Sequence, residues 1–174
     1  MDSFPEINTN NLKLRKLCPD DIPSLVKYAG NKKIADQVLN IPHPYGEFDA
    51  VFRISYVVQG FKNKTRYAFA ITLKETNQLI GEISLHLDHE KRNAELGYWV
   101  GEPFWSQGIA TEATMAIVKF GFETLELHKI YATCHVDNEA SVKVLLKNGM
   151  ILQQVNGSVA LYNVQKKEVK TAGD

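Results

Sequence analysis

The chain has little of what several common protein classes require. Its 174 residues include two cysteines, Cys18 and Cys134, and a pair so far apart has no metal-ligand spacing. Lysine plus arginine and aspartate plus glutamate number 20 each, so the formal net charge is zero and no overall field steers the protein toward nucleic acid or membrane. No apolar N-terminal segment indicates export. We therefore expect a cytoplasmic protein with two reduced thiols, no metal, and neither nucleic acid nor membrane as a partner.

Two nucleotide-binding signatures are also absent. No Lys-Ser or Lys-Thr closes a Walker loop, and the chain contains no Gly-x-Gly-x-x-Gly. No repeat, low-complexity run or linker rich in proline, glycine and serine interrupts the sequence, whose length is typical of one domain. A single domain is therefore predicted over residues 1–174.

Short β-rich runs alternate with segments of helical periodicity. After an opening strand, Asp20 or Asp21 can cap a helix that ends near Gly30. The further expected helices are Phe48–Gln59, Ile109–Leu125 and Glu139–Asn148. One hairpin is expected over Tyr67–Leu73 and Leu79–Leu87, and another over Ile151–Val155 and Val159–Val164. Single strands are expected over Ala94–Val100 and Lys129–Val136. The fold class is therefore predicted to be α+β (mixed α/β), with a largely antiparallel mixed sheet of about six to seven strands covered by about four helices.

The segment Gly97–Ala113, Gly-Tyr-Trp-Val-Gly-Glu-Pro-Phe-Trp-Ser-Gln-Gly-Ile-Ala-Thr-Glu-Ala, has the layout of an anion-binding loop. An apolar strand ends at Gly101, a short loop follows, and a helix begins at small residues. The first N–H groups of a helix lack partners and carry about half a positive charge, so a pyrophosphate settles there if no side chain blocks its approach. Gly108 and Ala110 leave that approach open.

With its surroundings, this segment resembles the acetyl-CoA loop of the GNAT acetyltransferase superfamily. There the loop reads Gln/Arg-x-x-Gly-x-Gly/Ala; here Gly108 and Ala110 fit, while Trp105 stands at the first position. Trp105 departs from the general pattern in a way that the RimJ/RimL-like branch, the ribosomal-protein N-terminal acetyltransferases, commonly shares.

Further motifs follow in that family's order. Asn11–Arg15 with Pro19–Asp21 resembles its opening strand and first helix, and Ile41–Tyr45 resembles the loop before its second helix. Asp137–Ser141 and Leu146–Met150 resemble its late Asn-x-x-Ser helix and the Lys-x-Gly-Phe ending. The resemblance covers most of the chain and implies a GNAT-like fold with acetyl-CoA as cosubstrate.

The resemblance also implies which residues contact acetyl-CoA. An extended pantetheine arm can pair with strand backbone as an added strand would, and the same backbone can donate an N–H to the oxyanion, worth typically about 3 kcal/mol. Ser141 is the implied partner of the departing thiolate, as hydrogen-bond donor or proton relay; alternatively, Asn138 and Ser141 only cap their helix. The implied contacts are Trp99, Val100 and Gly101 for the arm, Gln107, Gly108, Ile109, Ala110 and Thr111 for the pyrophosphate, and Asn138 and Ser141 on the late helix.

Glu95 is the candidate general base, acting through a water beside the cofactor strand. Strand alternation places it on one face with Gly97 and Trp99. Polar side chains also lie at alternate positions along the preceding strand, so Glu82 is an alternative base. Water without a carboxylate is a further alternative. Equally, both rows can be structural groups joined by hydrogen bonds. The row on the preceding strand is Glu82, Ser84 and His86.

Two other kinds of side chain are not expected to take part in the chemistry. Glu112 shares a helix face with Lys119 and Glu123, which indicates a solvated residue. Neither cysteine is expected at the site: Cys18 falls in the opening strand and Cys134 in a later one. Acetyl transfer is therefore expected to be direct, without a covalent acetyl-enzyme.

Together these features predict an acetyl-CoA-dependent N-acetyltransferase that acts on a primary amine, a protein or peptide N-terminal α-amine. His43 and Tyr45 are the expected lining of the acceptor mouth. Two alternatives remain open: transfer to a small amine such as a polyamine or aminoglycoside, and a non-catalytic acyl-CoA-binding regulatory module. The expected partners are acetyl-CoA and the amine, and the expected oligomeric state is a monomer or homodimer.

Overall fold

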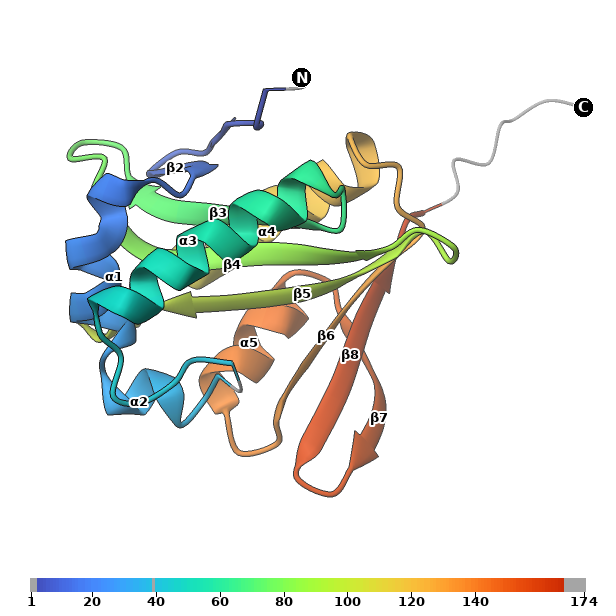
Figure 1. The fold of residues 1–174 in the computed structure, drawn as a ribbon. Helices are drawn as coiled ribbons and strands as arrows, with labels where there is room; N and C mark the ends of the chain where they lie inside the picture. The colour runs from blue at the N-terminus through green and yellow to red at the C-terminus, as the bar shows by residue number, and fades with distance from the viewer. Residues whose placement is uncertain (1–2, 39, 168–174) are drawn as a thin grey trace, which may run out of the picture.

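The computed structural model describes residues 3–38 and 40–167 (Figure 1). Its strands are β1 (Ile7–Asn8), β2 (Leu12–Lys16), β3 (Arg66–Leu73), β4 (Leu79–Asp88), β5 (Asn93–Val100), β6 (Lys129–His135), β7 (Ile151–Asn156) and β8 (Val159–Gln165). Its helices are α1 (Ile22–Ala29), α2 (Lys32–Ala35), α3 (Glu47–Lys62), α4 (Ile109–Glu123) and α5 (Glu139–Lys147), with short 3₁₀ segments at Pro19–Asp21 and Glu102–Phe104. Within the described ranges no helix has the length and apolarity needed to cross a membrane.

The strands form one sheet in the order β1-β2-β3-β4-β5-β6-β8-β7. Neighbours are antiparallel except β5 and β6, which are parallel. The predicted fold class is therefore confirmed. This sheet has eight strands, more than the expected count, because the two-residue strand β1 pairs with β2. The short helix α2 was also not expected; the Asn31 side chain caps it by accepting a hydrogen bond from the Lys33 amide.

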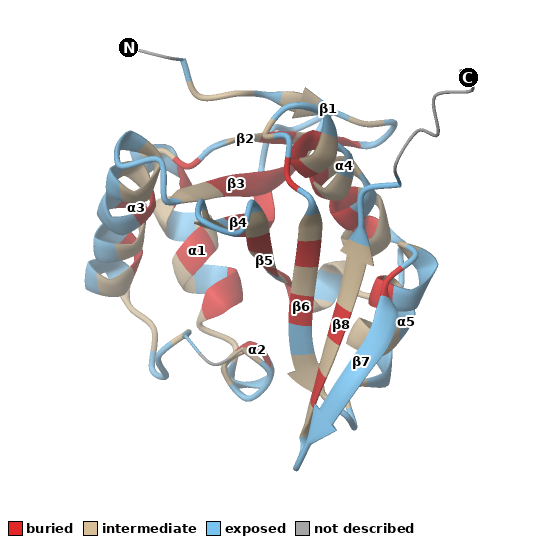
Figure 2. Ribbon diagram, turned by 90° about the vertical axis from the view of Figure 1, so that its right-hand side faces the viewer, coloured by how far each residue is buried: buried red, intermediate tan, exposed pale blue. Residues whose placement is uncertain are grey.

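Two apolar cores lie on opposite faces of the sheet. α4 and α5 pack on one face, over strand residues such as Leu14 and Ile83. α1 and α3 pack on the other face, over residues such as Ala70 and Trp99. Figure 2 shows the buried residues gathered in the central strands, whereas β7 is exposed along its length. Because β4 and β5 are packed from both sides, their side chains have fixed directions.

Asp21 stands at the N-cap position of α1, but its carboxylate does not cap that helix. It accepts hydrogen bonds from both terminal nitrogens of Arg15, at 2.9 and 2.8 Å, and from the Cys18 amide at 2.9 Å. Cys18 itself lies beyond the end of β2, not in the opening strand. Asp21 therefore joins the end of β2 to the first helical segment.

β5 and β6 separate soon after they meet. Their pairing covers only Asn93–Glu95 and Lys129–Tyr131. Beyond that point β5 remains paired with β4, while β6 pairs with β8. Figure 1 shows the two strands diverging, with α5 visible between them. The sheet therefore opens in its middle.

Candidate active site

A cavity of about 710 Å³ occupies the opening between β5 and β6. Its walls come from these two strands, the start of α4, the helix α5 and the segment that includes α2. The predicted acetyl-CoA contacts line it with the exception of Gly101 and Gln107, and Glu95 lines it too. Cavities of this size bury most of a small ligand. The structure thus brings into one place residues that lie far apart in the sequence.

The start of α4 faces this cavity. Gly108 is the N-cap residue and has a φ of 78°, in the left-handed region that glycine adopts without cost. Among the described residues nothing lies within 4 Å of where its Cβ would stand. The first amides of α4, at Ile109, Ala110 and Thr111, are those that a helix leaves without internal partners. They form an unobstructed cradle for an anion.

The backbone of β5 alternates between its neighbour and the opening. The Gly101 amide donates a 2.8 Å hydrogen bond to the Ile80 carbonyl on β4. Because successive residues of a strand direct their backbone groups to opposite sides, the N–H and C=O groups of Tyr98 and Val100 point toward the gap. Of the three predicted strand contacts, Val100 therefore has its backbone N–H placed to pair with an extended ligand.

Trp105 holds the loop against the end of β5. Its indole N–H donates a 2.6 Å hydrogen bond to the Val100 carbonyl, and its ring packs against both apolar cores. The next loop contact is local: the Gln107 side-chain amide donates to the Pro103 carbonyl at 3.0 Å. The residue that departs from the superfamily pattern thus fixes the geometry of the loop.

Asn138 and Ser141 begin α5. The Asn138 side-chain oxygen accepts a 3.1 Å hydrogen bond from the Ser141 amide, so Asn138 is an N-cap. The Ser141 hydroxyl instead makes a 2.9 Å hydrogen bond with the hydroxyl of Tyr98 on β5. Burial raises the pKa of Tyr98, although the bond to Ser141 acts in the opposite direction. This pair of hydroxyls, which sequence reasoning missed, spans the opening.

Cys134 lines the same cavity from β6, which corrects the expectation that neither cysteine lies at the site. Burial raises the pKa of its thiol, while a hydrogen bond with Ser141 lowers it in part. Because the thiolate is the nucleophilic form, the net rise leaves less reactive thiolate than an exposed cysteine would have. The position alone therefore does not make Cys134 an activated nucleophile.

The other face of β5 carries Glu95. Its register partner on β4 is His86, and the next cross-strand pairs on that face are Ser84 with Gly97 and Glu82 with Trp99. Glu82 is 3% exposed and forms an ion pair with Arg53 of α3, with Nε and Oε2 3.2 Å apart. Glu95 is half-buried and lines the cavity. Of the two candidate bases, Glu95 is the carboxylate that faces the opening.

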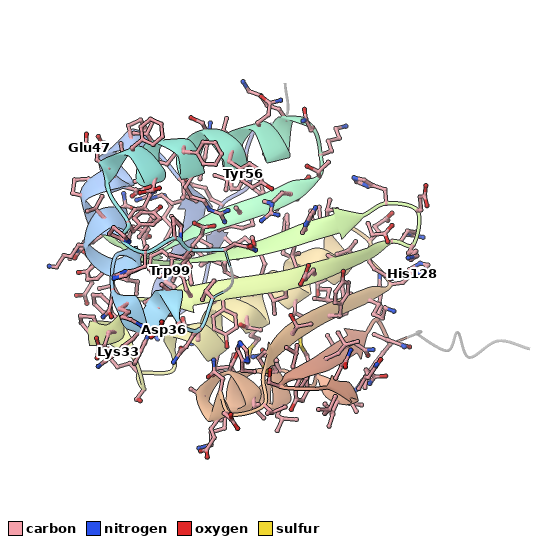
Figure 3. All side chains as sticks on the ribbon, turned by 60° about the horizontal axis from the view of Figure 1, so that its bottom comes forward. Lys33, Asp36, Glu47, Tyr56, Trp99 and His128 are labelled. Carbon is pink, nitrogen blue, oxygen red and sulfur yellow. The ribbon has the colours of Figure 1, made fainter. Side chains whose placement is uncertain are left out.

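His43 and Tyr45 lie outside the cavity lining found for the described residues. His43 is exposed, whereas Tyr45 is partly buried against the core under α1 and α3, where burial and the nearby Glu82 raise its pKa to about 12. The wall near Trp99 comes instead from the segment around α2 (Figure 3). Figure 3 also shows that His128 lies at the opposite end of the sheet.

Glu112 is a structural residue and not simply a solvated one. Its carboxylate accepts hydrogen bonds from the Thr9 hydroxyl at 2.6 Å and from the Asn11 amide at 2.8 Å. Burial raises the pKa of Glu112, but the hydrogen bonds from Asn11 and Thr9 outweigh it and the net direction is downward. α4 is thereby tied to the segment before β2, away from the cavity. Among residues 3–38 and 40–167, no group of three or more histidine, cysteine, aspartate or glutamate side chains is placed to hold a metal ion.

An anion cradle, an open strand edge, a carboxylate and a hydroxyl pair around one cavity are the parts that acetyl transfer from a thioester requires. Residues 11–151 match the acetyltransferase (GNAT) domain family. The chain belongs to the GNAT acetyltransferase family and is an N-acetyltransferase by class.

Individual relatives agree with this assignment. The uncharacterized N-acetyltransferase YoaA of Bacillus subtilis (strain 168) is 30% identical over 147 residues, which cover 84% of this chain and 82% of YoaA. The ribosomal-protein-serine acetyltransferase of Escherichia coli (strain K12) is 35% identical over 88 residues, 50% of this chain and 49% of that protein. Among solved structures, RimL, a ribosomal α-N-protein acetyltransferase in complex with coenzyme A, has a TM-score of 0.82 at 19% identity, covering 92% of this chain and 98% of RimL. The expected family, its Rim-type likeness and acetyl-CoA as cosubstrate are confirmed.

Proposed function

We propose that the protein transfers the acetyl group of acetyl-CoA directly to the α-amino group of a protein or peptide N-terminus, in the cytoplasm. The observation that supports this most is the arrangement of Glu95 and Ser141 around the opening in the sheet. Strand alternation places Glu95 on the face of β5 shared with Trp99, whereas Ser141 approaches the opposite face from α5. A thioester lying in the gap would meet the amine on one side and release sulfur on the other.

Each step of the transfer then has a group of this chain near it. The pyrophosphate rests on the first amides of α4, and the pantetheine arm pairs with the free edge of β5. The acceptor amine, in its neutral form, attacks the carbonyl carbon, and its nitrogen gives up one proton to Glu95 through a water. The carbonyl oxygen takes up the electron pair and accepts a hydrogen bond from the Val100 amide. When the carbonyl reforms, the C–S bond breaks and sulfur leaves toward Ser141.

The choice of acceptor follows from the strength of the base. An α-amino group with a pKa near 8 is about one-tenth neutral at pH 7, whereas a lysine amine with a pKa near 10.4 is neutral in only about four molecules in ten thousand. Glu95 acting through a water is a weak base, so it does little to increase the small neutral fraction of a lysine amine. The site therefore suits an amine that is already partly neutral at physiological pH.

Matched peptides test the proposal. We expect acetyl-CoA-dependent acetylation of a short peptide with a free N-terminus to be faster than that of the same peptide blocked at its N-terminus and carrying one internal lysine. Mass spectrometry locates the acetyl group, and a thiol reagent measures released CoA. A clear preference for the lysine peptide contradicts the α-amine assignment. Acetylation of polyamines alone indicates a small-molecule acceptor, and acetyl-CoA binding without CoA release from any amine indicates the non-catalytic module.

A further inference from the structure

The hydroxyl groups of Tyr98 and Ser141 meet across the opening in the sheet. Tyr98 projects from β5 on the face covered by α4 and α5, and its ring packs against the apolar core there. Ser141 lies in the first turn of α5 and lines the cavity. The two oxygens are 2.9 Å apart, although the residues are 43 positions apart in the sequence. The Asn138 side chain occupies the Ser141 amide and not its hydroxyl. The hydroxyl contacts Tyr98 and the Cys134 thiol, so its single proton is donated to a ligand in the cavity when it turns from Cys134 to that ligand.

We propose that Tyr98 is a positioning residue, which orients and polarises the Ser141 hydroxyl toward the sulfur of coenzyme A so that sulfur leaves as a stabilised thiolate. The proposal rests on the acetyl transfer proposed above and names the part of the site that receives the leaving group. In this chain of donors, the Tyr98 O–H donates to Ser141 Oγ, and the Ser141 O–H donates to sulfur. Consecutive hydrogen bonds of this kind strengthen one another in a site of low dielectric constant.

The step balances without a proton moving along the chain. The amine proton goes to Glu95 through water, the C–S bond breaks, and its electron pair stays on sulfur. The thiolate takes a proton from solvent after release. A serine hydroxyl is too weak an acid to protonate a thiolate, whose conjugate thiol has an ordinary pKa near 8.5. The raised pKa of Tyr98 fits this role, because a phenol that stays protonated remains a hydrogen-bond donor.

Two substitutions separate this positioning role from simple packing. Tyr98→Phe keeps the ring in the core and removes only the hydroxyl, and Ser141→Ala removes the group through which Tyr98 acts. Tyr162→Phe is a matched control, because Tyr162 is buried in the same core and is outside the cavity lining among the described residues.

We expect Tyr98→Phe to lower kcat about 5- to 10-fold with the KM for acetyl-CoA unchanged, the size of one lost hydrogen bond. Ser141→Ala should lower kcat further, and the double variant should be no slower than Ser141→Ala alone, because Tyr98 has no effect without Ser141. Tyr162→Phe should have the kcat of the parent. A parental kcat for Tyr98→Phe, or losses that multiply in the double variant, overturns the proposal.

A binding measurement tests the same idea without turnover. Calorimetry of CoA and acetyl-CoA, each from pH 7 to 9.5, gives the ratio of their affinities; protein groups that titrate alike in both complexes cancel from it. If the two hydrogen bonds stabilise the thiolate, the affinity for CoA should increase relative to that for acetyl-CoA as pH rises, and Tyr98→Phe should reduce this increase several-fold. An equal increase in parent and variant contradicts the proposal. If the parent acetylates no amine, the proposed function fails, while this ratio still decides the role of Tyr98.

Discussion

The indole nitrogen of Trp105 lies 2.6 Å from the carbonyl oxygen of Val100. This hydrogen bond closes the loop between β5 and α4, the two elements that would hold the arm and the pyrophosphate of the same acetyl-CoA molecule. The spacing between the two proposed binding regions therefore depends on an uncharged side chain, Trp105.

Replacing Trp105 by phenylalanine tests this dependence. The variant keeps an aromatic ring between the two cores but loses a hydrogen bond worth about 1 kcal/mol. We expect acetyl-CoA to bind about fivefold more weakly, with a smaller effect on kcat, as measured by calorimetry and initial rates. Unchanged affinity would show that the loop keeps its geometry without the indole.

Gly108→Val should abolish acetyl-CoA binding, because its side chain would stand where the pyrophosphate approaches the α4 amides. Gly149→Val is the matched control: Gly149 has a φ of 75° and, like Gly108, has no described atom within 4 Å of its Cβ position. Both variants meet similar backbone strain, of about 1–2 kcal/mol, so both should melt cooperatively at a lower temperature. Only Gly108→Val should lose binding in calorimetry. Binding by Gly108→Val as tight as that of the parent would refute the loop assignment.

Glu95→Gln and Glu82→Gln separate the two candidate bases. Glu95→Gln should lower kcat/KM about 100-fold at neutral pH, and less as pH rises toward the pKa of the acceptor and more amine is already neutral. Glu82→Gln breaks a buried ion pair with Arg53 and should lower the free energy of unfolding by about 3 kcal/mol. Its pH–rate profile should keep the shape of the parent profile. A flattened profile in Glu82→Gln, with a parental profile in Glu95→Gln, would reverse the assignment.

Glu112 makes stability depend on pH in a known direction. Its folded-state pKa is lowered, so its contribution is fully present above the ordinary glutamate pKa of about 4.3 and is lost as pH falls through the lowered value. Glu112→Gln should therefore lower the free energy of unfolding at pH 7 by about 1 kcal/mol, with a lower melting temperature. The difference from the parent should shrink at strongly acidic pH. Thermal melts followed by circular dichroism measure it, and a difference that grows on acidification would contradict the hydrogen-bonded carboxylate.

Local pattern was sufficient for most of the fold. The β7–β8 hairpin and the helix that begins after Gly108 form as predicted, because turn chemistry and apolar periodicity act over a few residues. The turn is made by Gly157 and Ser158, one residue later than the Asn156–Gly157 pair predicts, because Asn156 still pairs with Val159. β1 and α2 were missed because two- and four-residue elements carry too little periodicity to be seen.

The site was less predictable, because it depends on contacts between distant segments. Alternation along β5 did place Glu95 and Tyr98 on opposite faces of the strand, but it did not show which element Tyr98 meets. The bond from Tyr98 to Ser141 and the position of Cys134 depend on how far β6 diverges from β5. That divergence is a property of the whole sheet, so no short stretch of sequence encodes it.

The walls of the opening between β5 and β6 belong to two separately packed layers. α4 and α5 form the side on which we propose that the acetyl donor lies, whereas the segment around α2 borders the other side and packs with α1 and α3. Substitutions near α2 can therefore change which amine fits while the donor loop stays the same, so sequences that share Gly108 and Trp105 need not share an acceptor. Because donor and acceptor would lie against different walls, both can be bound at once, as direct transfer requires, and initial-rate plots should intersect.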